Sequence, residues 1–141
     1  MASTMRHDER GFTLVELLVV VLIVTILSAV IIAVLINQRE KAQDAAAKTG
    51  VKLAAGTLHV YKQDHDTFAG ADRDALIAIE PAIASVRGLT VEGDVESFEV
   101  SVESAAGEAG GGPFVIVYDT GVTDRICLRP GQGGCPDGGR W

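Results

Sequence analysis

The sequence predicts an α+β fold in which a long N-terminal helix packs against a small antiparallel β-sheet of about three to four strands. Two observations lead to this prediction. Residues 12–66 keep a helical pattern, first apolar and then amphipathic, whereas residues 96–141 alternate like strands between glycine-rich loops. The 141 residues suffice for about one folded domain.

The first part of the predicted helix is apolar. From Leu17 to Ile36, every residue is apolar except Thr25 and Ser28. As a helix, this stretch would span about 30 Å, the hydrocarbon thickness of a bilayer. Lipid offers no water to the backbone, so we expect residues 12–36 to form a membrane-spanning helix. The two hydroxyls are able to bond to preceding carbonyls of that helix and so to bend it weakly.

The helix is predicted to continue through residues 37–66 with an apolar face. Small and apolar residues recur there at steps of three or four, which predicts a stripe toward the core: Ala42, Ala46, Thr49, Leu53, Thr57 and Val60. The opposite half is expected to face solvent and carries Glu40, Asp44, Lys48 and Lys52. Gly50 and Gly56 either weaken the helix or mark close packing.

The rest of the chain divides into a loop and a sheet. Residues 67–95 are turn-rich and are predicted to connect the helix to the sheet, with a short helix from an Asp72 cap to Ile79. Residues 96–141 are predicted to form an antiparallel meander that covers the amphipathic half of the long helix. Its strands are expected at Ser97–Glu103, Phe114–Tyr118 and Arg125–Leu128.

Two cysteines, Cys127 and Cys135, lie far downstream of the apolar segment. A cysteine pair in a small exported domain predicts a disulfide, and hence an oxidising compartment. The alternative is a pair of free thiols. Two cysteines without a nearby histidine cannot complete a zinc site, so we expect no metal. We expect Trp141 to pack over the disulfide loop, and the alternative is an exposed Trp141 that is available for binding.

Composition and motifs argue against two function classes. The net charge is −7, and no stretch concentrates Lys or Arg among aromatics, so the bare chain is not expected to bind nucleic acid. The sequence shows no histidine paired with a nucleophile, no P-loop and no dinucleotide fingerprint. We therefore expect no catalytic residues and no cofactor.

The most specific signal lies where the polar N-terminus meets the apolar segment, and it reads Arg10-Gly11-Phe12-Thr13-Leu14-Val15-Glu16-Leu17-Leu18-Val19-Val20. This stretch resembles the processing signal of the type IV prepilins and the type II secretion pseudopilins. A secretory signal peptide differs, because its cleavage site follows a shorter apolar stretch. The resemblance implies a pilin-like fold and a structural, non-enzymatic role.

The resemblance also implies how the N-terminus is processed. A membrane prepilin peptidase would remove the leader, residues 1–11, by cutting between Gly11 and Phe12, and would then N-methylate Phe12. Glu16 is a carboxylate among apolar residues, which is costly in hydrocarbon. The resemblance implies that Glu16 pairs with the α-amine of a neighbouring subunit and so sets the register of assembly.

For function, the resemblance implies the structural subunit of a type IV pilus, a fimbrium that polymerises as a homo-oligomeric helical filament through residues 12–36. Its partners would be the prepilin peptidase and the inner-membrane pilus assembly platform. The chain would start as a single-pass precursor in the cytoplasmic membrane, with its C-terminal domain exported, and end in an extracellular pilus. Such filaments serve adhesion, motility, DNA uptake or protein secretion.

Two alternatives remain at the level of sequence. One is a pseudopilin or minor pilin of a type II secretion or DNA-uptake machine. The other is a membrane-anchored binding domain with an uncleaved signal anchor. Charge adds a conflict, because more Lys and Arg follow the apolar segment than precede it, which by the positive-inside rule disfavours an exported C-terminus. The processing signal and the cysteine pair both favour export.

Overall fold

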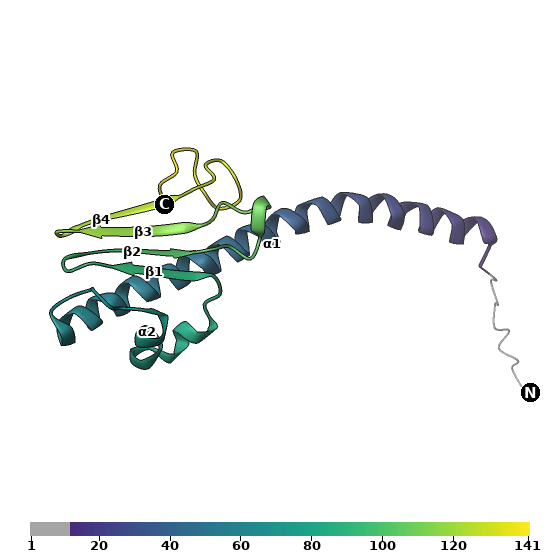
Figure 1. Cartoon of the computed structure of the whole chain (residues 1–141). Helices are drawn as coiled ribbons and strands as arrows, with labels where there is room; N and C mark the ends of the chain where they lie inside the picture. The colour runs from purple at the N-terminus through teal and green to yellow at the C-terminus, as the bar shows by residue number, and fades with distance from the viewer. Residues whose placement is uncertain (1–11) are drawn as a thin grey trace, which may run out of the picture. The chain divides into compact units, whose positions relative to one another are not determined.

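The computed structural model describes residues 12–141, apart from the side chain of Ala33. The chain divides into two compact units, and the boundary between them in the sequence follows Leu35. The predicted leader, including Gly11, lies outside the described residues. The elements, labelled in Figure 1, are helices α1 (Leu14–His65) and α2 (Arg73–Ile79), 3-10 helices η1 (Pro81–Ser85) and η2 (Gly107–Ala109), and strands β1 (Leu89–Gly93), β2 (Ser97–Val102), β3 (Phe114–Asp119) and β4 (Val122–Cys127).

The first unit consists of the apolar part of α1. Its large apolar side chains between Leu17 and Leu35 are exposed by 47% to 66%, on every side of the helix. The hydroxyls of Thr25 and Ser28 donate to the carbonyls of Val21 and Val24, each at 2.7 Å, which confirms the predicted bonds to preceding carbonyls. By length and composition, α1 is able to cross a membrane.

The second unit, residues 36–141, contains the sheet. Its four strands lie side by side in the order β1-β2-β3-β4, and each neighbouring pair is antiparallel (Figure 1). The predicted α+β class, with a long helix packed on an antiparallel sheet, is confirmed. Strands β2 and β3 match their predicted positions, whereas β4 begins three residues earlier than expected. Strand β1 falls inside residues 67–95, where the sequence predicted only a loop around one short helix.

The short helix α2 forms as its capping residues predict. The Asp72 carboxylate accepts the N–H of Ala75 at 2.8 Å, and the helix ends at Ile79, just before Pro81 opens η1. Arg73 then fixes the end of η1, because its guanidinium donates to the carbonyls of Ala84 and Val86 at 3.0 and 3.1 Å. These bonds hold the chain where it turns into the sheet.

The hydrophobic core lies between the second half of α1 and one face of the sheet. Strand β2 contributes alternate residues, as its pattern predicted, and the larger buried residues come from every layer: Val51, Leu58, Phe68, Leu76, Ile83, Phe98, Val100, Val102, Phe114 and Ile116. Burial of these side chains supplies the main force that holds the sheet on the helix.

The predicted buried face of α1 is wrong in phase. The buried face centres on Asp44, Ala47, Val51, Ala54, Leu58 and Tyr61, with Gly50, Ala55 and Thr57 buried beside them. Of the predicted stripe, only Thr57 is buried and Leu53 half-buried, whereas Ala42, Ala46, Thr49 and Val60 are exposed. Alanine and threonine occur on both faces and do not distinguish them. The larger Val51, Leu58 and Tyr61 decide the phase, because they bury more apolar area.

The two helical glycines differ in their surroundings. A Cβ added at Gly50 would lie 2.8 Å from Cγ1 of Val86, so this glycine marks close packing between α1 and the chain after η1. A Cβ added at Gly56 would meet nothing within 4 Å. Gly56 therefore weakens the helix without a packing gain.

Candidate processing and assembly site

The residues implied in processing lie at the start of α1. Phe12 and Thr13 precede the first helical residue, Leu14, and the Phe12 side chain is exposed. Cleavage after Gly11 and methylation of Phe12 stay predictions, because Gly11 lies outside the described residues.

Thr13 and Glu16 form a reciprocal pair that caps α1. The backbone N–H and the hydroxyl of Thr13 donate to Oε2 of Glu16 at 3.0 and 2.9 Å, and the Glu16 N–H donates to the Thr13 hydroxyl at 3.2 Å. This arrangement is a capping box, which satisfies backbone donors that the first turn of a helix leaves unpaired.

The capping box gives Glu16 a local role besides the predicted pairing with a neighbouring subunit. Its signal was present, since Thr13-Leu14-Val15-Glu16 has the spacing of a capping box directly before an apolar run. Both Thr13 donors reach Oε2, and a carboxylate offers a second oxygen to another donor. Glu16 can therefore cap its own helix and still receive an amine from outside.

Comparison with known proteins identifies this N-terminal segment. Residues 6–36 match a family model described as the prokaryotic N-terminal methylation motif. The segment carries the type IV prepilin and pseudopilin signature. No curated protein and no solved structure matched the chain. The methylation motif contains Gly11, Phe12 and Glu16 and ends at Ile36, the last residue of the predicted membrane segment. Together with the apolar helix, the methylation motif fits an inner-membrane-anchored, pilin-like precursor, and the class that it marks is structural and not enzymatic.

A second cluster lies at the opposite end of the sequence, around the two cysteines. Cys127 ends β4, and Cys135 lies at disulfide distance from it, with 5.8 Å between the two Cα atoms. Both side chains are buried. The loop between them, residues 128–134, curves through its own backbone bonds, which run from Cys135 N–H to the Gln132 carbonyl at 2.8 Å and from Gly131 N–H to the Cys135 carbonyl at 3.1 Å.

Asp44 of α1 holds this loop, and the prediction that Asp44 faces solvent is wrong. The side chain has no exposed surface, and its Oδ2 accepts the N–H groups of Gly111 and Gly134 at 2.8 and 2.6 Å. Helical periodicity could not reveal this role, because both donors come from loops far along the chain. The carboxylate joins α1, the loop before β3 and the cysteine loop at one point.

The pocket around Asp44 is built from glycines. Cβ atoms added at Gly110 or Gly133 would collide with the Asp44 carboxylate, and one added at Gly111 would collide with Cys135. Gly133 also has a φ of 50°, a conformation that other residues rarely adopt. The glycine-rich loops, which the sequence showed only as turns, thus bring backbone donors close to a buried charge.

Lys48, one turn after Asp44, completes the contact between α1 and the cysteine loop. Its ammonium donates to the Gly134 carbonyl at 2.6 Å and lies 5.1 Å from the centre of the Phe114 ring. Burial lowers the pKa of Lys48, the charge of Asp44 opposes that shift, and Lys52 adds to it. Lys48, which was predicted to face solvent, is therefore half-buried.

Trp141 packs on this cluster. Its ring meets Phe114 edge to face at 5.7 Å, and its indole N–H donates to the Ile126 carbonyl at 2.9 Å. Trp141 therefore packs on the domain, as expected. The partners named here belong to β3 and β4, whereas the sequence predicted the disulfide loop. The ammonium groups of Lys48 and Lys52 lie 5.5 and 5.2 Å from the centre of the ring.

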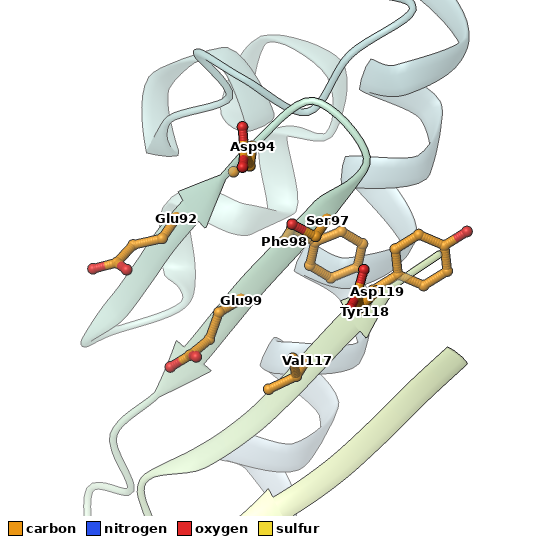
Figure 2. Close-up of a pocket in the computed structure, with 9 residues that line it drawn as sticks. Glu92, Asp94, Ser97, Phe98, Glu99, Val117, Tyr118 and Asp119 are labelled. Carbon is orange, nitrogen blue, oxygen red and sulfur yellow. The ribbon is translucent and has the colours of Figure 1, made fainter. Parts of the chain in front are cut away.

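An acidic depression of about 450 Å³ lies at the end of the sheet where β1 and β2 are joined, and Figure 2 shows its lining. It is lined by Glu92, Asp94, Glu99 and Asp119 together with Phe98 and Tyr118. Within residues 12–141, no group of three His, Cys, Asp or Glu side chains is placed to hold a metal ion. The depression therefore contributes negative surface charge near the turns of the sheet.

Proposed function

We propose that the chain is a pilin, the structural subunit of a type IV pilus, which polymerises through residues 12–36 after leader cleavage and N-methylation of Phe12. The observation that carries this proposal is the methylation motif at residues 6–36, which ends in a helix with exposed apolar side chains on every side. An anchor alone would explain the helix, but it would not explain the motif.

The exposed apolar helix would be covered by lipid in the precursor and by protein in the filament. A helix that is apolar all round must be covered by lipid or by protein. In the precursor, the bilayer of the inner membrane would cover residues 12–36. In the filament, the same residues of neighbouring copies would replace the lipid, with the prepilin peptidase and the assembly platform acting between the two states.

Glu16 is proposed to direct this change of environment. A carboxylate in hydrocarbon is costly unless it is paired, and the α-amine that cleavage creates on Phe12 of a neighbouring copy is a suitable partner. The capping box supports this role, because it fixes the Glu16 side chain at the start of α1.

The part after residue 36 is proposed to be the exported domain. Its amphipathic helix, connecting loop and sheet form one compact unit, and its cysteine pair suits an oxidising compartment. The precursor would thus lie in the cytoplasmic membrane, and the mature subunit would lie in an extracellular filament.

Replacing Glu16 tests the proposal. Glu16→Val is expected to leave the precursor cleaved and membrane-bound but to abolish filaments in sheared fractions. Thr25→Val is the matched control, because it also replaces a polar residue of the apolar segment by valine, and it is expected to assemble normally. Normal filament yield from Glu16→Val would contradict the proposed role of Glu16. A chain that stays membrane-bound and never assembles, even unmodified, would favour the anchored binding domain.

A further inference from the structure

An apolar groove of about 450 Å³ lies between α1, the chain after η1 and the C-terminal end of β2. Its lining includes Ala46, Leu53, Val86, Arg87, Val102 and Ala105. It runs along part of the α1 face that the sequence predicted to be buried and that the isolated chain leaves exposed at Ala46 and Thr49. We call this feature the groove.

The opposite end of the sheet presents exposed valines. Val95 lies in the turn between β1 and β2, and Val122 begins β4 after the turn from β3, with exposed fractions of 55% and 66%. Ser97 of β2 pairs with Asp119 of β3, which in turn pairs with Val122, so the two turns lie next to each other. We call Val95, Val122 and the neighbouring Asp94 and Asp119 the tip; Figure 2 shows Asp94 and Asp119 beside the acidic depression.

The groove and the tip lie at the two ends of one domain. Strand β2 starts at the tip with Ser97 and reaches the groove with Val102, a separation of about 17 Å along the strand. Helix α1 spans the same interval, since Ala46 lines the groove and the Lys62 ammonium donates to the Val95 carbonyl at 2.9 Å. The two surfaces therefore cannot meet within one copy.

The charges at the two surfaces are complementary. Glu103 also lines the groove, but its carboxylate lies 3.5 Å from the guanidinium of Arg129 and is neutralised by it. The positive charge of Arg87 is then unbalanced, so the groove is net positive.

At the tip, the Lys62 ammonium lies 2.7 Å from the Glu96 carboxylate and neutralises it. The negative charges of Asp94 and Asp119 are then unbalanced, so the tip is net negative. The apolar surface of the groove thus lies beside positive charge, and that of the tip lies beside negative charge. This complementarity favours one orientation of contact between the two surfaces.

From these observations we infer that the tip of one copy docks into the groove of the next, with Val122 against the apolar wall and Asp119 beside Arg87. Because the contact joins two different surfaces, it repeats head to tail and builds an open filament unless its rotation closes a ring. The inference rests on the proposed pilin function and adds a contact between exported domains to the assembly through residues 12–36.

Cross-linking in assembled filaments tests the contact directly. A photoreactive phenylalanine analogue replaces Val122 in the full chain, and filaments sheared from cells are irradiated and digested. Mass spectrometry is expected to find links between position 122 and peptides that contain Ala46 or Val86 of another copy. The same analogue at Leu128, which is also exposed, serves as the control and is expected to give no link to the groove.

Paired substitutions test the same contact by its effect on assembly. Ala46→Phe fills the groove and is expected to lower the filament yield at least tenfold, whereas Ala45→Phe, exposed on α1 outside the groove lining, is expected to leave it unchanged. Arg87→Asp and Asp119→Arg are each expected to weaken filaments toward salt and detergent, and their combination is expected to restore resistance. That rescue would not follow from a general loss of folding.

The outcomes separate the two proposals. Normal filaments from Ala46→Phe and Arg87→Asp, with no link from position 122 to the groove, would overturn the head-to-tail contact alone and leave the pilin function standing. Failure of the unmodified chain to form any filament would overturn the proposed function and the contact together. Links to the groove and rescue by the charge swap would establish the contact.

Discussion

The buried carboxylate of Asp44 accepts the N–H of Gly134 at 2.6 Å, across 90 positions of sequence. Gly134 directly precedes Cys135, so this one bond ties the cysteine loop to the helix that begins in the apolar segment. The second bond, from Gly111 N–H at 2.8 Å, ties the loop before β3 to the same oxygen. Asp44 therefore organises the part of the domain that lies farthest along the sequence.

Replacement of Asp44 is expected to destabilise the exported domain in a graded way. Asp44→Ala leaves the buried N–H of Gly111 and the part-buried N–H of Gly134 unpaired and should lower the free energy of unfolding by about 2–4 kcal/mol. Asp44→Asn keeps one acceptor oxygen and should cost less than half of that. Urea unfolding of the full chain in detergent micelles, followed by near-ultraviolet circular dichroism, measures both. Equal stability of the alanine variant and the unmodified chain would contradict the structural role of Asp44.

Loss of the cysteine pair is expected to act through the same contact. Cys127→Ser with Cys135→Ser should lower the free energy of unfolding by about 2–3 kcal/mol for a loop of this length. It should also speed hydrogen exchange of the Gly134 amide, because a loop without the disulfide opens more often and breaks the bond from Gly134 to Asp44 when it does. Combined with Asp44→Ala, its cost should be less than additive, since both changes release the same loop. Full additivity would mean that the loop and Asp44 act independently.

The two glycines of α1 are expected to respond differently to alanine. Gly56→Ala should raise the free energy of unfolding by about 0.5–1 kcal/mol, because it restores helix propensity in open space. Gly50→Ala should lose that gain, because its Cβ would press on Val86. Thermal unfolding of the two variants side by side checks the contrast, and a stabilised Gly50→Ala would show that Val86 yields freely.

The two roles of Glu16 are expected to separate by substitution. Glu16→Gln keeps a side-chain acceptor for the capping box but removes the charge, whereas Thr13→Ala keeps the charge but removes the two capping-box bonds that the Thr13 hydroxyl makes. If the charge directs assembly, the glutamine variant should lose filaments and the alanine variant should retain most of them. Filament yield in sheared fractions gives the comparison. The reverse order would assign the effect of Glu16 to capping alone.

Strands β1 and β2 carry like charges directly opposite each other. Glu92 and Glu99 are register partners, and Figure 2 shows both side chains projecting to the same side of the sheet. Glu99→Thr should stabilise the domain by about 0.2–1 kcal/mol, because cross-strand like charges repel and threonine suits a strand. The gain should shrink at high salt. A gain that is independent of salt would point to strand propensity and not to charge.

Most of the architecture could be predicted from the sequence, because its elements have strong local patterns. The apolar segment, the alternation in β2 and the Asp72 cap each depend on neighbouring residues, and the structure confirms them. The phase of α1 was mispredicted, because Ala46 and Ala47 differ in burial but not in chemistry. Strand β1 was missed, because its five residues include Glu92 and Gly93 and lie among turns.

The candidate sites also divide into those with a local sequence signal and those without one. Gly11, Phe12 and Glu16 are predicted from a local motif, and the capping box of Thr13 and Glu16 also has a local signal. Asp44 had none, because its partners Gly111 and Gly134 approach it only after the sheet and the cysteine loop have folded. A buried charge held by distant backbone donors leaves no pattern in a single sequence.

The most direct test of the account is mass spectrometry of the N-terminal peptide, from membranes and from filaments sheared off cells. The account predicts a terminus at an N-methylated Phe12 in the sheared fraction. The same terminus found in membranes alone would point to a pseudopilin or a minor subunit. An intact Met1 leader in every fraction would contradict the pilin account and favour a membrane-anchored domain.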